Sequence, residues 1–109
     1  METKTTVIRW SARSYDPDTI FIGRPSKWGN PFHIGRDGDR HEVIEKYIWW
    51  FIAPERAALR AAAIRELRGK KLACYCHPKL CHGHVLAHYV DSGEGDYNLY
   101  TRTRFAVRV

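Results

Sequence analysis

The sequence contains only three cysteines, one methionine and no long apolar run. The longest apolar stretch, Tyr47–Ala53, is far shorter than the roughly 20 residues of a membrane-spanning helix. The N-terminus has no apolar segment after its charged residues, so we expect no secretory signal and a cytoplasmic protein without a membrane partner. The sequence also lacks repeats, low-complexity tracts, the Walker G-K-[ST] motif and the dinucleotide fingerprint. These absences exclude a membrane protein and the commonest nucleotide-binding loops.

The three cysteines are too close together for a disulfide framework, since all lie within residues 74–81. Neighbouring residues of one strand rarely reach disulfide geometry, and a reducing cytosol disfavours the bond. An odd number of clustered thiols therefore indicates metal binding or a reactive thiol.

What the sequence has in excess is positive charge. Its 109 residues suit one domain, and 44% hydrophobic with 28% charged residues are typical of a globular protein. The 18 basic residues exceed the 12 acidic ones, which gives a net charge of +6. Such an excess favours anionic partners, namely nucleotides, nucleic acid or an acidic protein.

Apolar periodicity and turn residues predict a single α/β domain over residues 1–109, with its motifs in a core of about residues 5–90. We expect a small Rossmann-like domain, in which about three helices flank a short, mainly parallel sheet. The segment Thr19–Arg24 is apolar on both faces, which favours a central strand. The C-terminal extension, residues 97–109, alternates polar and apolar side chains and predicts an edge strand with an arginine stripe. The expected strands are Thr5–Trp10, Thr19–Arg24, Lys71–Cys76 and Thr101–Val109, and the stripe is Arg102, Arg104 and Arg108.

The helices have clear start and stop residues. Asp39 and Glu42 form a capping box that begins a helix ending near Ala53, and Pro54 restarts a second helix that ends near Arg68. A third helix begins at residue 81 or 82 and ends near residue 90. The inward faces that spacing predicts are Val43, Ile44, Tyr47, Ile48 and Phe51 for the first helix, and Ala57, Ala61, Ile64 and Leu67 for the second.

The proline-bounded segment Ile22–Phe32 (IGRPSKWGNPF) is the first candidate for a ligand site. It follows a predicted strand, and ligands of α/β sheets bind at the C-terminal ends of strands. The positively charged side chains of this segment are suited to bind a phosphate group, and its small hydrogen-bond donors are suited to contact the phosphate oxygens. Its indole is suited to stack on a nucleotide base. The alternative is a rigid corner whose Trp28 fills the core. The candidate ligand-binding residues are Gly23, Arg24, Ser26, Lys27, Trp28, Gly29, Asn30, Arg36 and Arg40.

A second cluster of chemically active side chains lies within residues 74–84. Cys74 and Cys76 share one face of a predicted strand, whereas Cys81 and His82 begin a helix whose dipole favours a thiolate. Three interpretations remain open. In the first, zinc is held by Cys74, Cys76, Cys81 and one of His77, His82 or His84. In the second, Cys81 is a catalytic nucleophile or redox thiol with His82 or His84 as its base. In the third, the cysteines are core residues and His82 touches a ligand.

At these two segments the sequence resembles a family of short bacteriophage and bacterial proteins, catalogued as a domain of unknown function. The resemblance covers roughly residues 5–90 and rests on IGRPSKWGNPF, on Arg40–Tyr47 and on ELRGKKLACYCHPKLCHGHVL at Glu66–Leu86. Tyr75 replaces a tryptophan that is usual in the family, and His84 stands where an aspartate is common. The resemblance implies a phage context, with nucleotide metabolism, DNA modification or interference with nucleotide signals as candidate roles.

Together these observations predict one pocket, formed by the loop at residues 24–31 and the turn at residues 76–84. Its ligand is a nucleotide or a nucleotide-derived phosphate, which the protein binds and either hydrolyses or transfers a group from. One alternative is a protein that sequesters the nucleotide without turnover. Another is a basic, zinc-stapled protein that binds nucleic acid.

Overall fold

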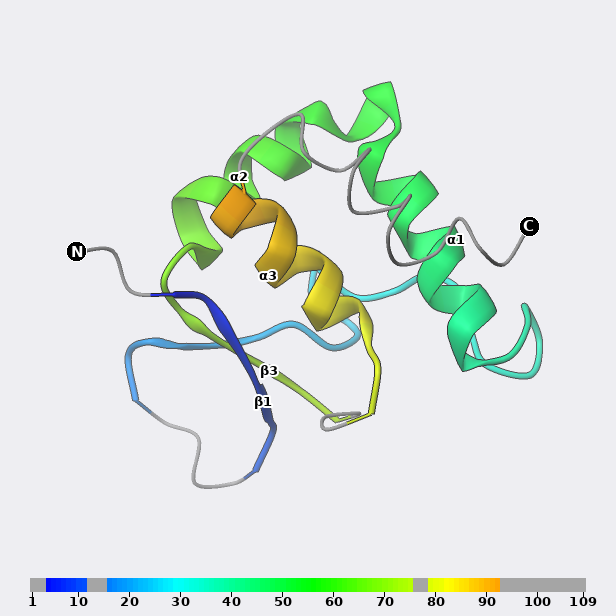
Figure 1. The fold of residues 1–109 in the computed structure, drawn as a ribbon, viewed down its shortest axis with the longest axis horizontal. Coiled ribbons are helices and arrows are strands. Elements are labelled where there is room, and N and C mark those ends of the chain that lie inside the picture. The colour runs from blue at the N-terminus through cyan, green and yellow to red at the C-terminus, as the bar shows by residue number, and fades with distance from the viewer. Residues whose placement is uncertain (1–3, 12–15, 76–78, 93–109) are drawn as a thin grey trace.

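The computed structural model describes residues 4–11, 16–75 and 79–92. In chain order the elements are β1 (Thr6–Arg9), β2 (Thr19–Phe21), α1 (Arg40–Ile52), the 3-10 turn η1 (Pro54–Arg56), α2 (Ala57–Leu67), β3 (Lys71–Cys74) and α3 (His82–Ser92). The helices gather on one side of the strands, and α3 contacts β1, β3 and both other helices (Figure 1). The predicted α/β class with three helices and a short parallel sheet is confirmed. The Rossmann-like designation stays a prediction.

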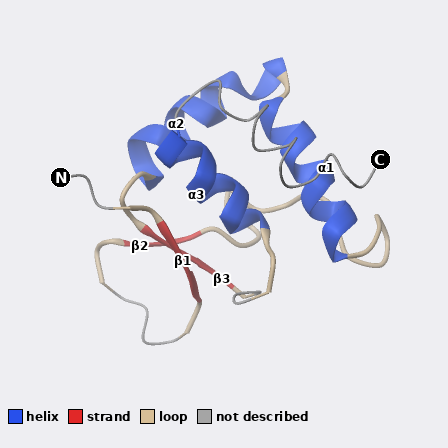
Figure 2. Cartoon of the chain, viewed as in Figure 1, coloured by secondary structure: helices blue, strands red, loops and turns tan. Residues whose placement is uncertain are grey.

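The sheet has the order β1–β3–β2, and both pairings are parallel. Thr6 and Thr19 both pair with Lys71, so the three strands start at the same level. The expectation that Thr19–Arg24 is the central strand is wrong for the described sheet, in which β3 is central and β2 lies at an edge. In Figure 2 the strands lie below the helices. The apolar character of that segment has a different cause, because Ile22 follows β2 and is fully buried under α3. The predicted strand Thr101–Val109, with its arginine stripe, lies outside the described residues.

The predicted start and inward face of α1 are confirmed. The Asp39 carboxylate accepts from the Glu42 amide at 2.8 Å, and the Glu42 side chain accepts from the Asp39 amide, also at 2.8 Å. Of the two adjacent tryptophans, Trp49 is 60% exposed, whereas Trp50 packs against the core and carries the Arg56 guanidinium over its ring. All five predicted core positions are buried: Val43, Ile44, Tyr47, Ile48 and Phe51.

The predicted inward face of α2 is largely wrong. Ala57 and Ala61 are exposed, Ile64 is half-buried, and of the predicted set only Leu67 is fully buried. The side chains that α2 does bury are Arg60, Ala62, Ala63 and Leu67. Arg60 explains why α2 turns a different face inward than predicted. Its guanidinium donates at 2.8 Å to the carbonyls of Phe51 and Ala53 at the end of α1. A buried cation that satisfies helix-terminal carbonyls is invisible to a purely apolar pattern.

The start of α3 lies very close to the strands. A Cβ atom on Gly83 would stand 2.8 Å from Ile22 Cδ1 and 3.2 Å from Val7 Cγ1. Glycine therefore lets the N-terminal turn of α3 approach the carboxyl end of the sheet. Within the described part of the chain, no helix is long and apolar enough to cross a membrane.

Candidate functional site

A cavity of about 390 Å³ lies where β2 and β3 end and where α1 and α3 begin. Gly23 and Arg24 follow β2, Cys74 ends β3, and Arg40 and His82 are the first residues of α1 and α3. The predicted pocket position, at one end of adjacent parallel strands, therefore holds a cavity. The described residues that line it are Gly23, Arg24, Asn30, Phe32, His33, Ile34, Arg40, Val43, Ile44, Cys74, Tyr75, Cys81 and His82.

The loop after β2 is folded by local hydrogen bonds into a tight corner. The Ser26 amide donates to the Gly23 carbonyl at 2.9 Å, and the Gly29 amide donates to the Ser26 carbonyl at 3.0 Å. The peptide bond between Arg24 and Pro25 is cis. Buried Asn30 then anchors the corner to α1, since its Nδ2 donates to the Val43 carbonyl at 3.1 Å.

Trp28 is a core residue, which corrects its predicted role in stacking on a base. Its side chain is 3% exposed and belongs to the main hydrophobic cluster, and it does not line the cavity. Its carbonyl accepts a hydrogen bond from the buried Tyr47 hydroxyl at 2.8 Å. Because the indole is almost fully buried and the Lys27 ammonium lies 4.9 Å from its ring centre, a ligand in the cavity does not stack on it. The aromatic side chains that do line the cavity are Phe32 and the exposed Tyr75.

Three other predicted ligand residues of the same loop also lie outside the cavity lining. Lys27 forms an exposed ion pair with Glu66 at 3.0 Å, on the side of α2. The Ser26 hydroxyl accepts from the Trp28 amide at 3.3 Å, so it stabilises the corner itself. Gly29 packs against Arg24, where an added Cβ would stand 2.9 Å from Arg24 Cγ. These residues shape the loop, and Arg24 is the side chain that the loop presents to the cavity.

Arg24 and Arg40 bring two guanidinium groups to the cavity. Arg24 Nη1 donates to the Asn30 carbonyl at 3.3 Å, and Arg40 Nη1 donates to the Leu80 carbonyl at 3.2 Å. A guanidinium has five N–H donors, so each keeps others beyond the one it uses here. In the described ranges neither forms an ion pair with a carboxylate, and the lining contains no Asp or Glu. The cavity therefore has uncompensated positive charge.

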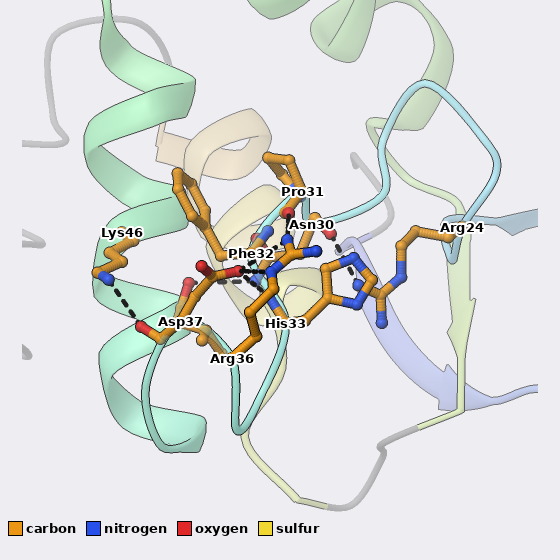
Figure 3. A network of polar contacts seen from close by, with 9 residues as sticks. Arg24, Asn30, Pro31, Phe32, His33, Arg36, Asp37 and Lys46 are labelled. Carbon is orange, nitrogen blue, oxygen red and sulfur yellow. Dashed lines mark hydrogen bonds and ion pairs between the residues drawn. The ribbon is translucent and has the colours of Figure 1, made fainter.

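Arg36, the remaining predicted cation, belongs to a neighbouring polar network (Figure 3). Its Nη2 lies 2.9 Å from an Asp37 carboxylate oxygen, and that oxygen also accepts from the His33 amide at 2.8 Å. These contacts, with Arg36 first, hold the pKa of Asp37 below its ordinary value. Partial desolvation, followed by the charges of Arg24 and Arg36, lowers the pKa of His33, whose ring faces the cavity. The charge of Arg36 is thus balanced by Asp37, and Arg36 acts on the cavity only through its electrostatic effect on His33.

His82 is a buried, neutral imidazole. Its Nε2 lies 2.7 Å from the Ile22 carbonyl, and since a carbonyl only accepts, Nε2 carries the proton. Burial lowers the pKa of His82 to about 4, the positive charge of Arg24 adds to the effect, and the hydrogen bond to Ile22 opposes it. His82 also packs edge-on against the Tyr47 ring. It therefore joins the start of α3 to the end of β2 and brings a neutral ring to the cavity.

The cysteine cluster is only partly described. Cys74 and Cys81 are each 1% exposed, and their sulfur atoms are 3.0 Å apart in the cavity wall. His84 Nδ1 lies 3.1 Å from the Cys81 amide, so its ring is turned toward the helix backbone. Cys76, the third thiol of the predicted zinc set, lies outside the described residues. Among the residues that are described, no group of three or more His, Cys, Asp or Glu side chains gathers as a metal site would require.

Sequence reasoning missed the far wall of the cavity, which consists of Phe32, His33, Ile34 and the buried Val43 and Ile44. Val43 and Ile44 are core residues, as predicted, and they also line one side of the cavity. The segment at 32–34 carried a usable signal, because it directly follows Pro31 at the end of the candidate loop and precedes the predicted start of α1.

Comparison with known proteins places the chain in a family. Residues 6–92 match the family described as domain of unknown function DUF4326. An uncharacterised 12.4 kDa protein in the nrdA-td intergenic region of Enterobacteria phage T4 is 39% identical over 74 residues, covering 66% of this chain and 67% of the phage protein. A search of solved structures gave no significant match. The predicted resemblance to an uncharacterised phage and bacterial family is thereby confirmed, and the chain belongs to the DUF4326 family.

Proposed function

We propose that the cavity binds a nucleotide or another small molecule that carries a phosphate group. One observation supports this proposal above all others. Two arginines, Arg24 and Arg40, border a cavity that has no acidic side chain in its described lining, and neither is paired with a carboxylate there. Arginine is the side chain best suited to bidentate contact with phosphate oxygens.

The backbone around the cavity favours an anion as well. Helix α3 begins in the cavity wall with His82. The Cys81 amide already donates to His84 Nδ1 at 3.1 Å and the His84 amide to the Cys81 carbonyl at 3.0 Å, so the amides that would serve an anion are those of His82 and Gly83. The positive end of the helix dipole adds to the field of the two arginines.

The rest of the wall suits the flat part of a nucleotide. A volume of about 390 Å³ is in the usual range for small-molecule sites, which are mostly apolar with a few polar groups. Val43 and Ile44 form an apolar side, and Phe32 and Tyr75 offer aromatic rings for stacking. In this proposal Tyr75 and Phe32 take the role that the sequence had suggested for Trp28.

Binding is the first part of the proposal, and turnover of the ligand is the second. Cys81 and His82 lie in the wall, where a thiol at the start of a helix is a candidate nucleophile and a neutral imidazole is a candidate base. The described lining offers no carboxylate for acid–base catalysis. A protein that binds the nucleotide without turnover is compatible with the same residues. In either case we place the protein in the cytoplasm of a bacterium or of a phage host.

The test is isothermal titration calorimetry with a panel of ligands. The panel contains ATP, GTP, pyrophosphate and, as a control without phosphate, adenosine. We expect phosphate-bearing ligands to bind and adenosine to bind far more weakly. A charge-assisted hydrogen bond contributes about 1.5–3 kcal/mol, so Arg24→Gln or Arg40→Gln should each raise Kd by roughly tenfold to a hundredfold.

The matched control is Arg65→Gln, which removes one exposed positive charge from α2, away from the cavity. This variant should bind like the parent. Equal weakening by Arg65→Gln and Arg24→Gln would mean that only net charge matters, which contradicts a cavity site. Duplex DNA that binds tightly, with log K falling by about 0.9 for each phosphate contacted as log salt rises, would instead favour a nucleic-acid-binding protein.

A further inference from the structure

We propose that Cys74 and Cys81 are a reversible redox pair that forms a disulfide in the cavity wall. The inference concerns these two thiols alone and does not depend on the ligand of the cavity. It also separates them from Cys76, with which the sequence grouped them.

The geometry brings the two sulfur atoms close together. Cys74 ends β3, Cys81 directly precedes α3, and the sulfur atoms are 3.0 Å apart. A disulfide bond measures about 2.05 Å, so the sulfurs need to approach by only about 1 Å. Both residues are thiols in this structure.

The two thiols are held in place by the core. Cys74 sits on the central strand between two parallel neighbours, and Cys81 belongs to the same hydrophobic cluster. Gly83 brings the start of α3 down onto Ile22, and a Cβ there would stand 3.3 Å from Cys81 Sγ. Packing therefore fixes both ends of the Cys74–Cys81 pair.

The cavity gives a small oxidant its route to the pair, because both side chains line it although each is 1% exposed. Hydrogen peroxide is an oxidant of suitable size. The Cys81 thiolate, favoured by the start of α3, attacks one peroxide oxygen, forms a sulfenic acid and releases hydroxide. The Cys74 sulfur then attacks the sulfenic sulfur, the S–S bond forms, and the oxygen leaves as water. In total two thiols and one peroxide give one disulfide and two waters.

The consequence is a covalent link between the end of β3 and the start of α3. Both are walls of the cavity, so the link changes the cavity chemically, replacing two S–H groups with one S–S bond. A dithiol reductant such as dithiothreitol reverses the reaction by thiol–disulfide exchange.

The experiment is peptide mapping by mass spectrometry of the full-length native protein after mild treatment with hydrogen peroxide and alkylation of the remaining thiols. We expect a Cys74–Cys81 cross-link, with Cys76 alkylated, and complete reversal by dithiothreitol. The Cys76→Ser variant should form the same cross-link, whereas Cys74→Ser and Cys81→Ser should form no intramolecular disulfide. As a control, the same oxidation is carried out on the protein unfolded in concentrated urea. There we expect a mixture of all three possible disulfides among Cys74, Cys76 and Cys81.

Three results would overturn the inference. One is a native cross-link that contains Cys76, and another is oxidation of single thiols to sulfinic or sulfonic acid without any cross-link. The third is one equivalent of zinc in the purified protein, measured by elemental analysis, that must be removed before any of the thiols reacts. Since the peptide map uses the parent protein, the inference stays testable even where a cysteine variant fails to fold.

Discussion

The buried imidazole of His82 makes a specific prediction about stability in mild acid. In the folded protein burial lowers the pKa of this ring to about 4, whereas the value for an exposed histidine is 6.5. Between these two values the unfolded chain binds a proton that the folded protein does not. The contribution of neutral His82 to stability is therefore complete above about pH 6.5 and is lost as the pH falls toward 4.

The magnitude follows from the two pKa values. Each unit of difference corresponds to 1.36 kcal/mol, so the full loss is about 3 kcal/mol, nearly all of it below pH 6.5. At pH 5 the loss relative to pH 7 is about 2 kcal/mol. A domain of this size has a total stability of about 5–15 kcal/mol, so the effect is well within reach of measurement.

The assay is urea unfolding of the parent protein and of His82→Gln at a series of pH values from 7 to 4.5. Glutamine keeps an N–H donor for the Ile22 carbonyl but does not titrate. The difference between the two curves isolates His82 from the other groups that titrate in this range. In parallel, the NMR signal of the ring that disappears in His82→Gln should titrate near pH 4 in the parent.

Two results would refute this reasoning. If the stability of the parent and of His82→Gln fell equally between pH 7 and pH 5, burial would not lower the pKa of His82. If the ring signal titrated near 6.5, the imidazole would be open to water in solution, and its hydrogen bond to Ile22 would not be the one described above.

Three further predictions concern stability and are checked by denaturant unfolding at neutral pH. Tyr47→Phe removes the hydroxyl that donates to the buried Trp28 carbonyl, and we expect a loss of about 1–2 kcal/mol, whereas an unchanged midpoint would show that the corner is not anchored there. Gly83→Ala places a methyl group 2.8 Å from Ile22 Cδ1 and should cost about 1–3 kcal/mol, so a neutral or stabilising effect would contradict the close approach of α3 to the strands. Asp39→Ala removes the capping box of α1 and should cost about 1 kcal/mol, whereas Asp39→Asn, a matched control that can still cap the helix, should cost less.

Much of the fold follows from local signals in the sequence. The start of α1 depends on Asp39 and Glu42, which act within one turn, and its buried stripe depends on spacing alone. The start of α3 and the strands β1 and β3 are likewise indicated by residues within those segments themselves. The strand order is different, because it depends on which strand the helices cover, and a short apolar segment such as Thr19–Phe21 does not reveal that.

The errors at the candidate site have physical causes. An indole between two prolines fits a stacking platform and a core plug equally well, and only the packing of Tyr47 and its neighbours selects the core for Trp28. The inward face of α2 was missed because Arg60 is buried to satisfy carbonyls at the end of α1. Arg24 and Arg40 both line the cavity because the carboxyl ends of parallel strands and the starts of α1 and α3 meet at one edge of the sheet.

The measurement that tests the central proposal most directly is a titration of ¹⁵N-labelled protein with ATP, followed by the shifts of its backbone amide signals. We predict that the largest changes fall on amides of the cavity wall, at residues 23–24, 32–34 and 81–83, and that they saturate. Arg24→Gln should require a higher ATP concentration to give the same changes. No saturable change, or changes centred on the exposed Arg65 of α2 instead of the cavity, would contradict the proposal that this cavity binds a phosphate-bearing ligand.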